Sequence, residues 1–301
     1  GTAAYFAGLA LVKASSAPGV RYNYFCGRLS GEGFPLYFPV ALAVKMPTAL
    51  LAALLALCAA LAFALIRAGP KRRRRVTRAL AARGGFPAAL AFLYLLLCAS
   101  SHVDIGVRHA FPVYVLSLVA AAGAARTLVR RARTLRALAA AVVALSALEA
   151  GARFGQEIPF GNLLVGGPAG VHRVLSDSNV EWGQAQGALF ERVRKGDLGR
   201  VGVSSVTLDE PEAIRAGVVE RPDNVAKLAG LDTVIVSIHL SDVAHAIETN
   251  HERFAKYDEL RGWLVPLVRA VEARAASVEP LGVEYRIYRL RPAQQTSPQR
   301  S

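Results

Sequence analysis

The densest group of polar side chains in this chain lies in residues 175–184, LSDSNVEWGQ. Its carboxylates and amides can hydrogen-bond to sugar hydroxyls, and its tryptophan ring offers an apolar face to a pyranose. Two carboxylates four residues apart could also act in general acid–base chemistry. An Asp-Ser-Asn cluster before a helix is equally an ordinary capping arrangement. Ligand binding and a structural role therefore both stay open for Asp177, Asn179, Glu181, Trp182 and Gln184.

A basic pair lies in residues 101–112, SHVDIGVRHAFP. Arg108 and His109 come directly before an apolar run, and a guanidinium can give a phosphate two parallel hydrogen bonds. The alternative is that the pair anchors a short loop at a membrane interface. Because His102, Asp104 and His109 match no common metal-binding spacing, no metal site is predicted.

A third candidate is Lys45, which follows the aromatic residues Tyr37 and Phe38 and precedes a long uncharged run. Its amino group could contact a pyrophosphate or a lipid phosphate. Lysines near helix ends usually extend to the membrane interface instead, and this is the structural alternative.

Apolar runs predict the elements that position these residues. A helix needs about 20 apolar residues to cross the hydrocarbon core of a membrane. The sequence predicts a transmembrane helical region over residues 46–152. Its expected spans are about 46–66, 84–101, 110–125 and 137–152. Residues 1–45 are expected to form an outer-face segment, in which the apolar stretch 36–44 is an interfacial or re-entrant piece. In the last span, Glu149 is close enough to a helix end to reach the lipid headgroups.

The charge distribution predicts an orientation. Residues 1–151 hold 18 Lys and Arg against three acids, whereas residues 152–301 hold 18 against 19. Most of the surplus lies in two connectors, 67–83 and 126–136, and the positive-inside rule places such connectors on the cytoplasmic side. A basic run can also bind nucleic acid, but this one lies between apolar spans and has no interleaved aromatic residues. No nucleic-acid partner is therefore expected.

Residues 153–291 are predicted to form a soluble α/β domain outside the cytoplasm. The β-branched runs 201–206 and 233–238 indicate buried strands, and strict alternation over 283–287 indicates a half-exposed strand. The last ten residues, 292–301, are polar and are expected to be disordered.

Two helices are expected in the same domain. One covers residues 187–195 and ends before Gly196. Ser241 is expected to cap the other, which runs through Lys256 with Phe254 on its apolar face. The predicted fold class is thus a multi-pass α-helical membrane protein of about four spans with a C-terminal extracytoplasmic α/β domain.

Four motifs, in this order, resemble one bacterial family. The first comprises GF at 33–34, LYFPVA at 36–41 and KxP at 45–47, and the second is IGVRHxFP at 105–112. The third joins GGP at 166–168 to DSNxEWGQ at 177–184, where the family more often has aspartate at the fifth position. The fourth is GxxYxIYxL at 282–290. Through these motifs the chain is similar to the protein-mannosyltransferase-like and aminoarabinose-transferase-like glycosyltransferases of the GT-C class.

The resemblance implies a multi-pass enzyme of the bacterial cytoplasmic (inner) membrane. Such an enzyme moves a sugar from a polyprenyl-phosphate donor to a hydroxyl of a lipid, glycan or protein on the outer face, usually with inversion. No cofactor is expected, and the lipid-linked sugar is the co-substrate. Arg108 and His109, together with Lys45, are the residues expected to hold the donor phosphate.

The same resemblance leaves the catalytic residue unknown. The family uses an acid in its first outer loop as the catalytic base, and the only acid before Lys45 is Glu32. We therefore expect this chain to be the C-terminal part of a longer enzyme. The alternative is a non-catalytic, membrane-anchored periplasmic binding or scaffold domain. A transporter is disfavoured, because the chain has no repeated pair of Gly- or Pro-broken spans.

Overall fold

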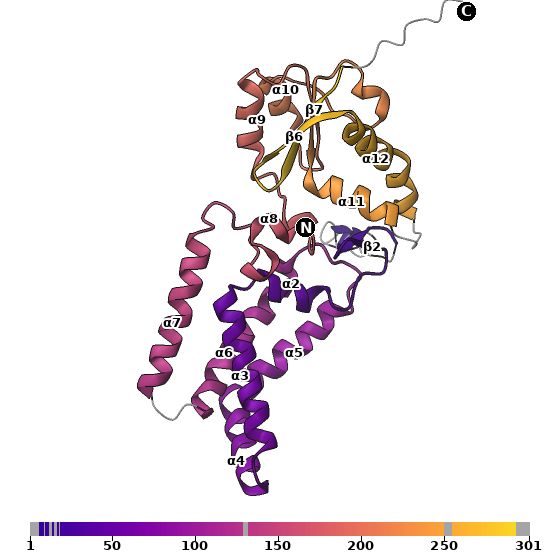
Figure 1. Ribbon diagram of the computed structural model, residues 1–301. Helices are drawn as coiled ribbons and strands as arrows, with labels where there is room; N and C mark the ends of the chain where they lie inside the picture. The colour runs from indigo at the N-terminus through magenta and orange to yellow at the C-terminus, as the bar shows by residue number, and fades with distance from the viewer. Residues whose placement is uncertain are drawn as a thin grey trace, which may run out of the picture. The chain divides into compact units, whose positions relative to one another are not determined.

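The computed structural model describes residues 6–8, 10, 11, 14, 17, 19–128, 132–249 and 255–292. Its contacts divide the chain into two compact units. The helical unit is Gly33–Val171, and the α/β unit joins Gly1–Glu32 to His172–Ser301 (Figure 1).

A short hairpin divides the expected segment 1–45 between the two units. β1 (Asn23–Phe25) and β2 (Arg28–Ser30) pair with each other in antiparallel fashion. Tyr24 and Leu29, one from each strand, are buried in the hydrophobic core of the α/β unit. Apolar burial therefore joins this early part of the chain to core residues that lie between Leu228 and Leu290.

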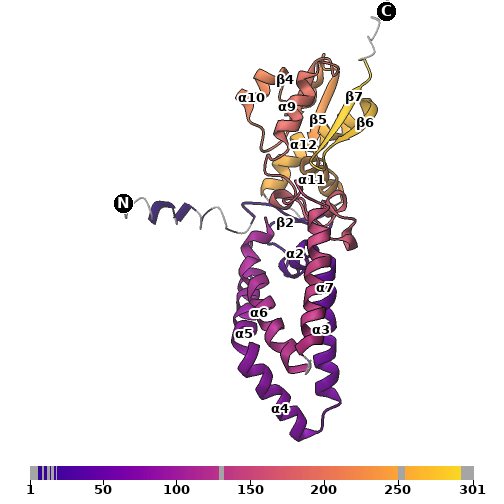
Figure 2. The same ribbon diagram turned by 90° about the vertical axis from the view of Figure 1, so that its left-hand side faces the viewer.

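The helical unit is built from helices that follow one another along the chain (Figures 1 and 2). They are α2 (Tyr37–Lys45), α3 (Thr48–Ile66), α4 (Pro70–Leu80), the π-helical turn η1 (Ala81–Gly85), α5 (Phe86–Ala99), the 3-10 helix η2 (Val107–Ala110), α6 (Phe111–Leu128), α7 (Ala132–Gly151), η3 (Leu163–Val165) and α8 (Pro168–Val171).

Four helical stretches of this unit are long and apolar enough to cross a membrane. They are Thr48–Ile66, Pro70–Ala99, Val107–Leu128 and Arg133–Gly151. Each stretch overlaps one of the four predicted spans, so the prediction of four such helices is confirmed. Almost none of their side chains is buried within the protein, and their apolar surfaces therefore face outward.

The sequence predicts a connector over 67–83, but most of this segment is helical. Only residues 67–69 link α3 to α4, since Pro70 begins α4 at a position where its missing N–H is not needed. The basic run that follows consists of good helix formers. α4 continues through η1 into α5, so that 70–99 form one uninterrupted helical stretch.

The second predicted connector, 126–136, is helical at both ends. Arg126 lies in α6, while Arg133 and Arg136 lie in α7. Residues 129–131, which include two further arginines, lie outside the described residues.

Pro47 separates the predicted interfacial piece from the first long helix. That piece is the helix α2, whose side chains Tyr37 and Phe38 are buried. Thr48 begins α3, and its N–H and hydroxyl both donate to the Glu149 carboxylate, at 2.6 and 2.8 Å. A carboxylate there also suits the positive end of the helix dipole. In the structure Glu149 thus caps α3 from the end of α7.

Asn162 completes the same junction from the other side. Its side-chain amide donates to the carbonyls of Ala43 and Met46, at 2.7 and 3.0 Å, and its backbone N–H donates to the Val44 carbonyl at 3.0 Å. These bonds hold residues 153–171, which the sequence places in the α/β domain, within the helical unit.

Small residues let η1 and α6 approach closely. A Cβ on Gly84 would lie 2.7 Å from the Ala120 carbonyl oxygen, and a Cβ on Gly123 would overlap the Arg83 carbonyl oxygen. Glycine and alanine permit this backbone contact, as they commonly do between helices in membranes.

The α/β unit contains a five-stranded mixed sheet with strand order β4-β3-β5-β7-β6. Its strands are β3 (Val201–Ser204), β4 (Val218–Glu220), β5 (Thr233–Ser237), β6 (Ala275–Leu281) and β7 (Tyr285–Leu290). Its helices are η4 (Asp177–Asn179), α9 (Gln186–Arg194), α10 (Glu210–Ala216), η5 (Val225–Leu228), α11 (Ile238–Thr249) and α12 (Ala255–Arg274). β4, β3 and β5 are parallel, whereas β7 is antiparallel to both of its neighbours.

Helices cover both faces of this sheet. Val234 and Val236 of β5 pack in one core with α11, α12 and the hairpin. Ile235, which points to the opposite face, packs in a second core with α9 and α10. Burial on both faces accounts for the continuous β-branched run of β5.

The predicted strands at 201–206, 233–238 and 283–287 correspond to β3, β5 and β7, and the predicted helix at 187–195 corresponds to α9. β4, β6 and α12 were not anticipated. β6 is an exposed edge strand that contains a proline, so it lacks the pattern of a buried strand.

The expected cap at Ser241 is wrong. α11 begins three residues earlier, where the Leu240 N–H donates to the Ser237 hydroxyl at 3.4 Å. Ser241 is buried inside the helix and its hydroxyl accepts from Arg286 at 3.1 Å. Lys256 lies in α12, while Phe254 and all but the first residue of the predicted disordered tail 292–301 lie outside the described residues.

Replacing Gly123 with alanine should lower the stability of the helical unit by about 1–3 kcal/mol, because the added methyl group forces η1 and α6 apart. Thermal unfolding of the purified chain in detergent would measure the loss. Gly151→Ala is the matched control, since a Cβ there has no neighbour within 4 Å. Equal unfolding temperatures in the two variants would contradict the close approach.

Candidate functional site

The first and second motifs meet in the helical unit. Gly33 has φ +84°, and the Phe34 N–H donates to the Asp104 carboxylate at 2.5 Å. A Cβ on Gly33 would lie 2.9 Å from that carboxylate and 3.1 Å from the Ser101 carbonyl oxygen. Glycine is required at this position both by its backbone conformation and by the loop packed against it.

Asp104 is therefore an organising residue of this region. Its side chain is buried, and burial raises the pKa of the carboxyl to about 6, while the Phe34 N–H and His102 act in the opposite direction. Sequence reasoning weighed Asp104 only as a metal ligand. Its rarity could have indicated a structural role, because Asp104 is one of only three acids in the basic first half of the chain.

Arg108 and His109 lie on η2, directly before α6, and both are exposed. The His109 carbonyl accepts a hydrogen bond from the Cys98 thiol at 3.6 Å, which ties η2 to the end of α5. α2 also packs against η2. The pair thus presents two side chains with basic nitrogens at the start of a long apolar helix.

Lys45 is the last residue of α2 and donates to the Ile158 carbonyl at 2.7 Å. Burial lowers the pKa of its amino group to about 7. The structure thus places the three predicted basic residues on two adjoining elements, α2 and η2. A bound anion near Lys45 would favour its charged form and raise the pKa again.

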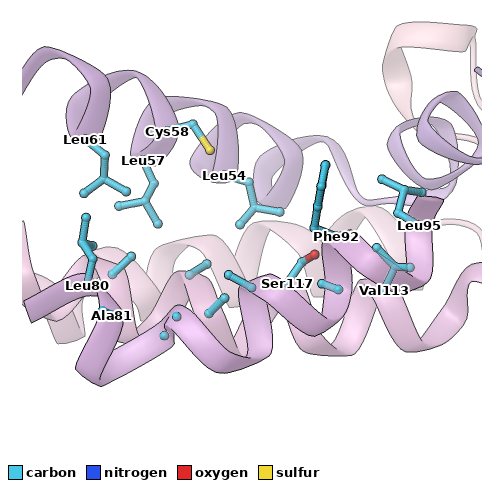
Figure 3. A pocket seen from close by; sticks show the side chains of 17 residues that line it. Leu54, Leu57, Cys58, Leu61, Leu80, Ala81, Phe92, Leu95, Val113 and Ser117 are labelled. Atoms are coloured by element: carbon cyan, nitrogen blue, oxygen red, sulfur yellow. The ribbon is translucent and has the colours of Figure 1, made fainter. Parts of the chain in front are cut away.

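An apolar groove of about 560 Å³ runs along the helical unit (Figure 3). α3, α5 and α6 each contribute to its walls, and hydrocarbon side chains dominate the lining. Leu61 and Leu80 lie at one end, and Leu95 and Val113 lie at the other (Figure 3). Val113 is five residues beyond Arg108, so the groove reaches the part of α6 that follows η2.

The polar segment 177–184 lies in the α/β unit, and its first residues are bound to His239. His239 is buried, and its Nδ1 accepts from the Ser176 hydroxyl at 2.8 Å and from the Asp177 N–H at 3.1 Å. A backbone N–H can only donate, so the proton of His239 resides on Nε2, where it faces the Tyr22 hydroxyl at 2.9 Å. Asp177 itself has φ +57°.

Glu181 is buried and accepts from three hydroxyls through one oxygen. The donors are Ser205 at 2.6 Å, Thr207 at 2.7 Å and Tyr285 at 3.1 Å. Among the described residues, its other oxygen has no hydrogen-bond partner. This network joins the third motif to the strand of the fourth motif.

Gln184 makes a second connection between the same motifs. Its side chain accepts from the Trp182 N–H at 2.6 Å and donates to the Val180 carbonyl and to Glu284, at 2.8 and 2.9 Å. Burial raises the pKa of Glu284, whereas the bond from Gln184 lowers it. Asn179 is buried and donates to the Ser176 carbonyl at 3.2 Å.

Trp182 differs from its neighbours, because its side chain is 54% exposed. Most other polar groups of the segment are bound to the segment itself or to the sheet. The structure therefore favours a structural role for Asn179, Glu181 and Gln184, and leaves Trp182 as a partly exposed aromatic residue of the segment.

The predicted site residues thus fall into two groups, one in each unit. Lys45, Arg108 and His109 belong to the helical unit, and residues 177–184 belong to the α/β unit. Within the described part of the chain, no three His, Cys, Asp or Glu side chains gather as metal ligands would.

No protein-family model, no curated protein and no solved structure matches this chain. Each unit therefore holds a candidate site that is defined by its own side chains. In the helical unit the candidates are basic residues at the start of a helix that lines an apolar groove. In the α/β unit they are a buried polar network and a partly exposed tryptophan.

Lys45→Met should flatten the dependence of stability on pH between about 7 and 10. In that interval the unfolded chain holds a proton on Lys45 that the folded chain has lost, so wild-type stability rises with pH. The slope from this residue is at most about 1.4 kcal/mol per pH unit. Unfolding in detergent across this pH range would measure it. Lys71→Met removes an exposed lysine of α4 and controls for the lost charge. If stability changed equally with pH in the two variants, the result would count against the burial of Lys45.

Glu181→Ala should lower the free energy of unfolding by about 3 kcal/mol, because three hydroxyl donors lose a buried acceptor. Trp182→Ala should lower it by less, by about 1 kcal/mol, since Trp182 is more than half exposed. Thermal unfolding of both purified variants, beside wild type, would compare them. Similar losses in the two variants would disprove this division of roles within the segment.

Proposed function

We propose that this chain belongs to a bacterial membrane glycosyltransferase of the GT-C class. The enzyme would transfer a sugar from a polyprenyl-phosphate donor to a hydroxyl acceptor on the outer face of the cytoplasmic membrane. The observation that carries the proposal is that motifs distant in sequence contact one another. Helix α2 of the first motif packs against η2 of the second, and Glu181 of the third motif binds Tyr285 of the fourth.

The four long apolar helices support a membrane location. Their exposed surfaces carry many large hydrophobic side chains, which in water would favour aggregation and which lipid would cover. The basic run in α4 and the arginines of early α7 would lie in the cytoplasm by the positive-inside rule. With four spans, η2 and the residues after α7 would then lie on the outer side.

The donor phosphate would bind at η2. Arg108 offers a planar pair of donors that fits a phosphate, and His109 lies beside it. The apolar groove that reaches Val113 would take part of the lipid chain, because hydrocarbon gains from contact with its leucine and alanine walls. Lys45, on the adjoining helix α2, would regain its proton near a phosphate and add to the attraction.

Within the α/β unit, Trp182 would contact a sugar or the acceptor. Trp182 is the residue of the third motif with an exposed ring, and aromatic rings commonly stack on the apolar face of a pyranose. The buried network around Glu181 would hold that ring in place rather than take part in the reaction. No residue of this chain is assigned as the catalytic base.

Arg108→Ala should weaken the binding of a polyprenyl phosphate by at least about ten-fold. This factor corresponds to about 1.4 kcal/mol, which is typical for the loss of a charge-assisted hydrogen bond. Arg108→Lys should recover only part of the affinity, because an amino group cannot form the paired hydrogen bonds of a guanidinium. Binding of radiolabelled polyprenyl phosphate to the purified chain in detergent would measure both.

Arg78→Ala is the matched control, since it removes an exposed arginine of α4 and should leave the affinity unchanged. Wild-type affinity in a folded Arg108→Ala variant would rule out the phosphate role of η2. Absence of lipid-phosphate binding in the wild-type chain would instead favour a membrane-anchored scaffold.

A further inference from the structure

A second cavity lies in the α/β unit, at the end of β3. It measures about 460 Å³, which is within the range of about 300–1,000 Å³ typical of small-molecule sites. Its lining includes the buried residues Ser204, Ser205 and Leu240, and the partly buried ring of Trp263. We propose that this cavity binds an uncharged saccharide, and this proposal does not depend on the donor site in the helical unit.

The topology of the sheet explains why a cavity forms at this point. The parallel strands β3, β4 and β5 all end at the same edge of the sheet. The chain leaves β3 through α10 on one face, and leaves β5 through α11 on the opposite face. Connections that diverge in this way open a crevice beyond the carboxyl ends of the strands, where α/β proteins commonly bind their ligands.

The charges around the cavity are balanced. Arg221 is paired with Glu210 and also donates to the Ser205 carbonyl at 3.3 Å. Lys227 lies 3.0 Å from Asp223, and a further carboxylate, that of Glu220, lies 3.6 Å from it. A phosphate would therefore meet carboxylates as well as cations. The balance disfavours an anionic ligand.

The same groups suit a ligand rich in hydroxyls. Paired guanidinium and carboxylate side chains offer donors and acceptors side by side, and a sugar hydroxyl can use both. Trp263 contributes an aromatic surface on which the apolar face of a sugar ring can lie. Its attachment to α12 and its packing against the core hold this ring in place before a ligand arrives.

Tryptophan fluorescence offers a direct test, since the chain contains only two tryptophans. In the Trp182→Phe background, Trp263 is the sole tryptophan, and excitation selective for tryptophan reports on it alone. The purified chain, held in a detergent without a sugar headgroup, is titrated with glucose, mannose, galactose, N-acetylglucosamine and maltose. We expect a saturable change in emission with at least one of these sugars, and calorimetry with the same sugars provides a second readout.

Variants then assign the binding to the cavity. Arg221→Ala and Asp223→Asn should each weaken binding by at least ten-fold. Arg215→Ala, which removes an exposed, ion-paired arginine of α10 outside the cavity, should leave it unchanged. Unfolding temperatures show that each variant is folded, and the exposed Asp223 gives a usable variant if Arg221→Ala fails to fold.

Three results would overturn the proposal. One is the absence of saturation with every sugar, by both emission and heat. Another is saturation by inorganic phosphate but by none of the sugars, which would indicate an anion site. The third is an equal loss of binding in Arg215→Ala, which would place the sugar elsewhere.

Discussion

The hydrogen bonds of Asn162 and Glu149 at the break between α2 and α3 are the constraint on which the helical unit depends. Pro47 cannot donate a backbone hydrogen bond, so α2 and α3 cannot form one continuous helix. At the break, the carbonyls before Pro47 and the N–H of Thr48 lack partners within a helix. The side-chain amide of Asn162 donates to the carbonyls before Pro47, and the Glu149 carboxylate accepts from the N–H of Thr48. Where water is scarce, each unmatched group would cost several kcal/mol.

This junction determines where the basic residues lie. Because α2 is held at an angle to the long helix that follows it, Lys45 can end beside Ile158 and α2 can pack against η2. Asp104 closes the same region by binding Phe34, so the loop before η2 is attached to the segment before α2. The exposed pair on η2 is thereby carried on a framework that these hydrogen bonds hold together.

Local sequence patterns predicted the helices and strands whose residues all lie in the same kind of surroundings. Continuous apolar runs indicated the four long helices, and β-branched runs indicated β3 and β5. The errors occurred where a distant partner decides the outcome. Ser241 matches a capping residue, but it is buried against Arg286 and the cap function falls to Ser237. Asn162 gave no local signal of its role, and Asp104 differed from its surroundings only as a rare acid. The partners of both residues are about 70 or more residues away in sequence.

The segment 177–184 illustrates why a dense polar motif is weak evidence for chemistry by itself. Buried polar groups must be matched by hydrogen bonds, so a cluster of carboxylates and amides is also what a well-ordered turn requires. Here Glu181 and Gln184 hold the segment to the last strand, and Asn179 closes its turn. What such a framework offers to a ligand is the group that it leaves exposed, and in this segment that group is the indole of Trp182. The hydrogen bonds of Glu181 and Gln184 therefore explain the order of the segment, and they are not by themselves evidence of a binding site.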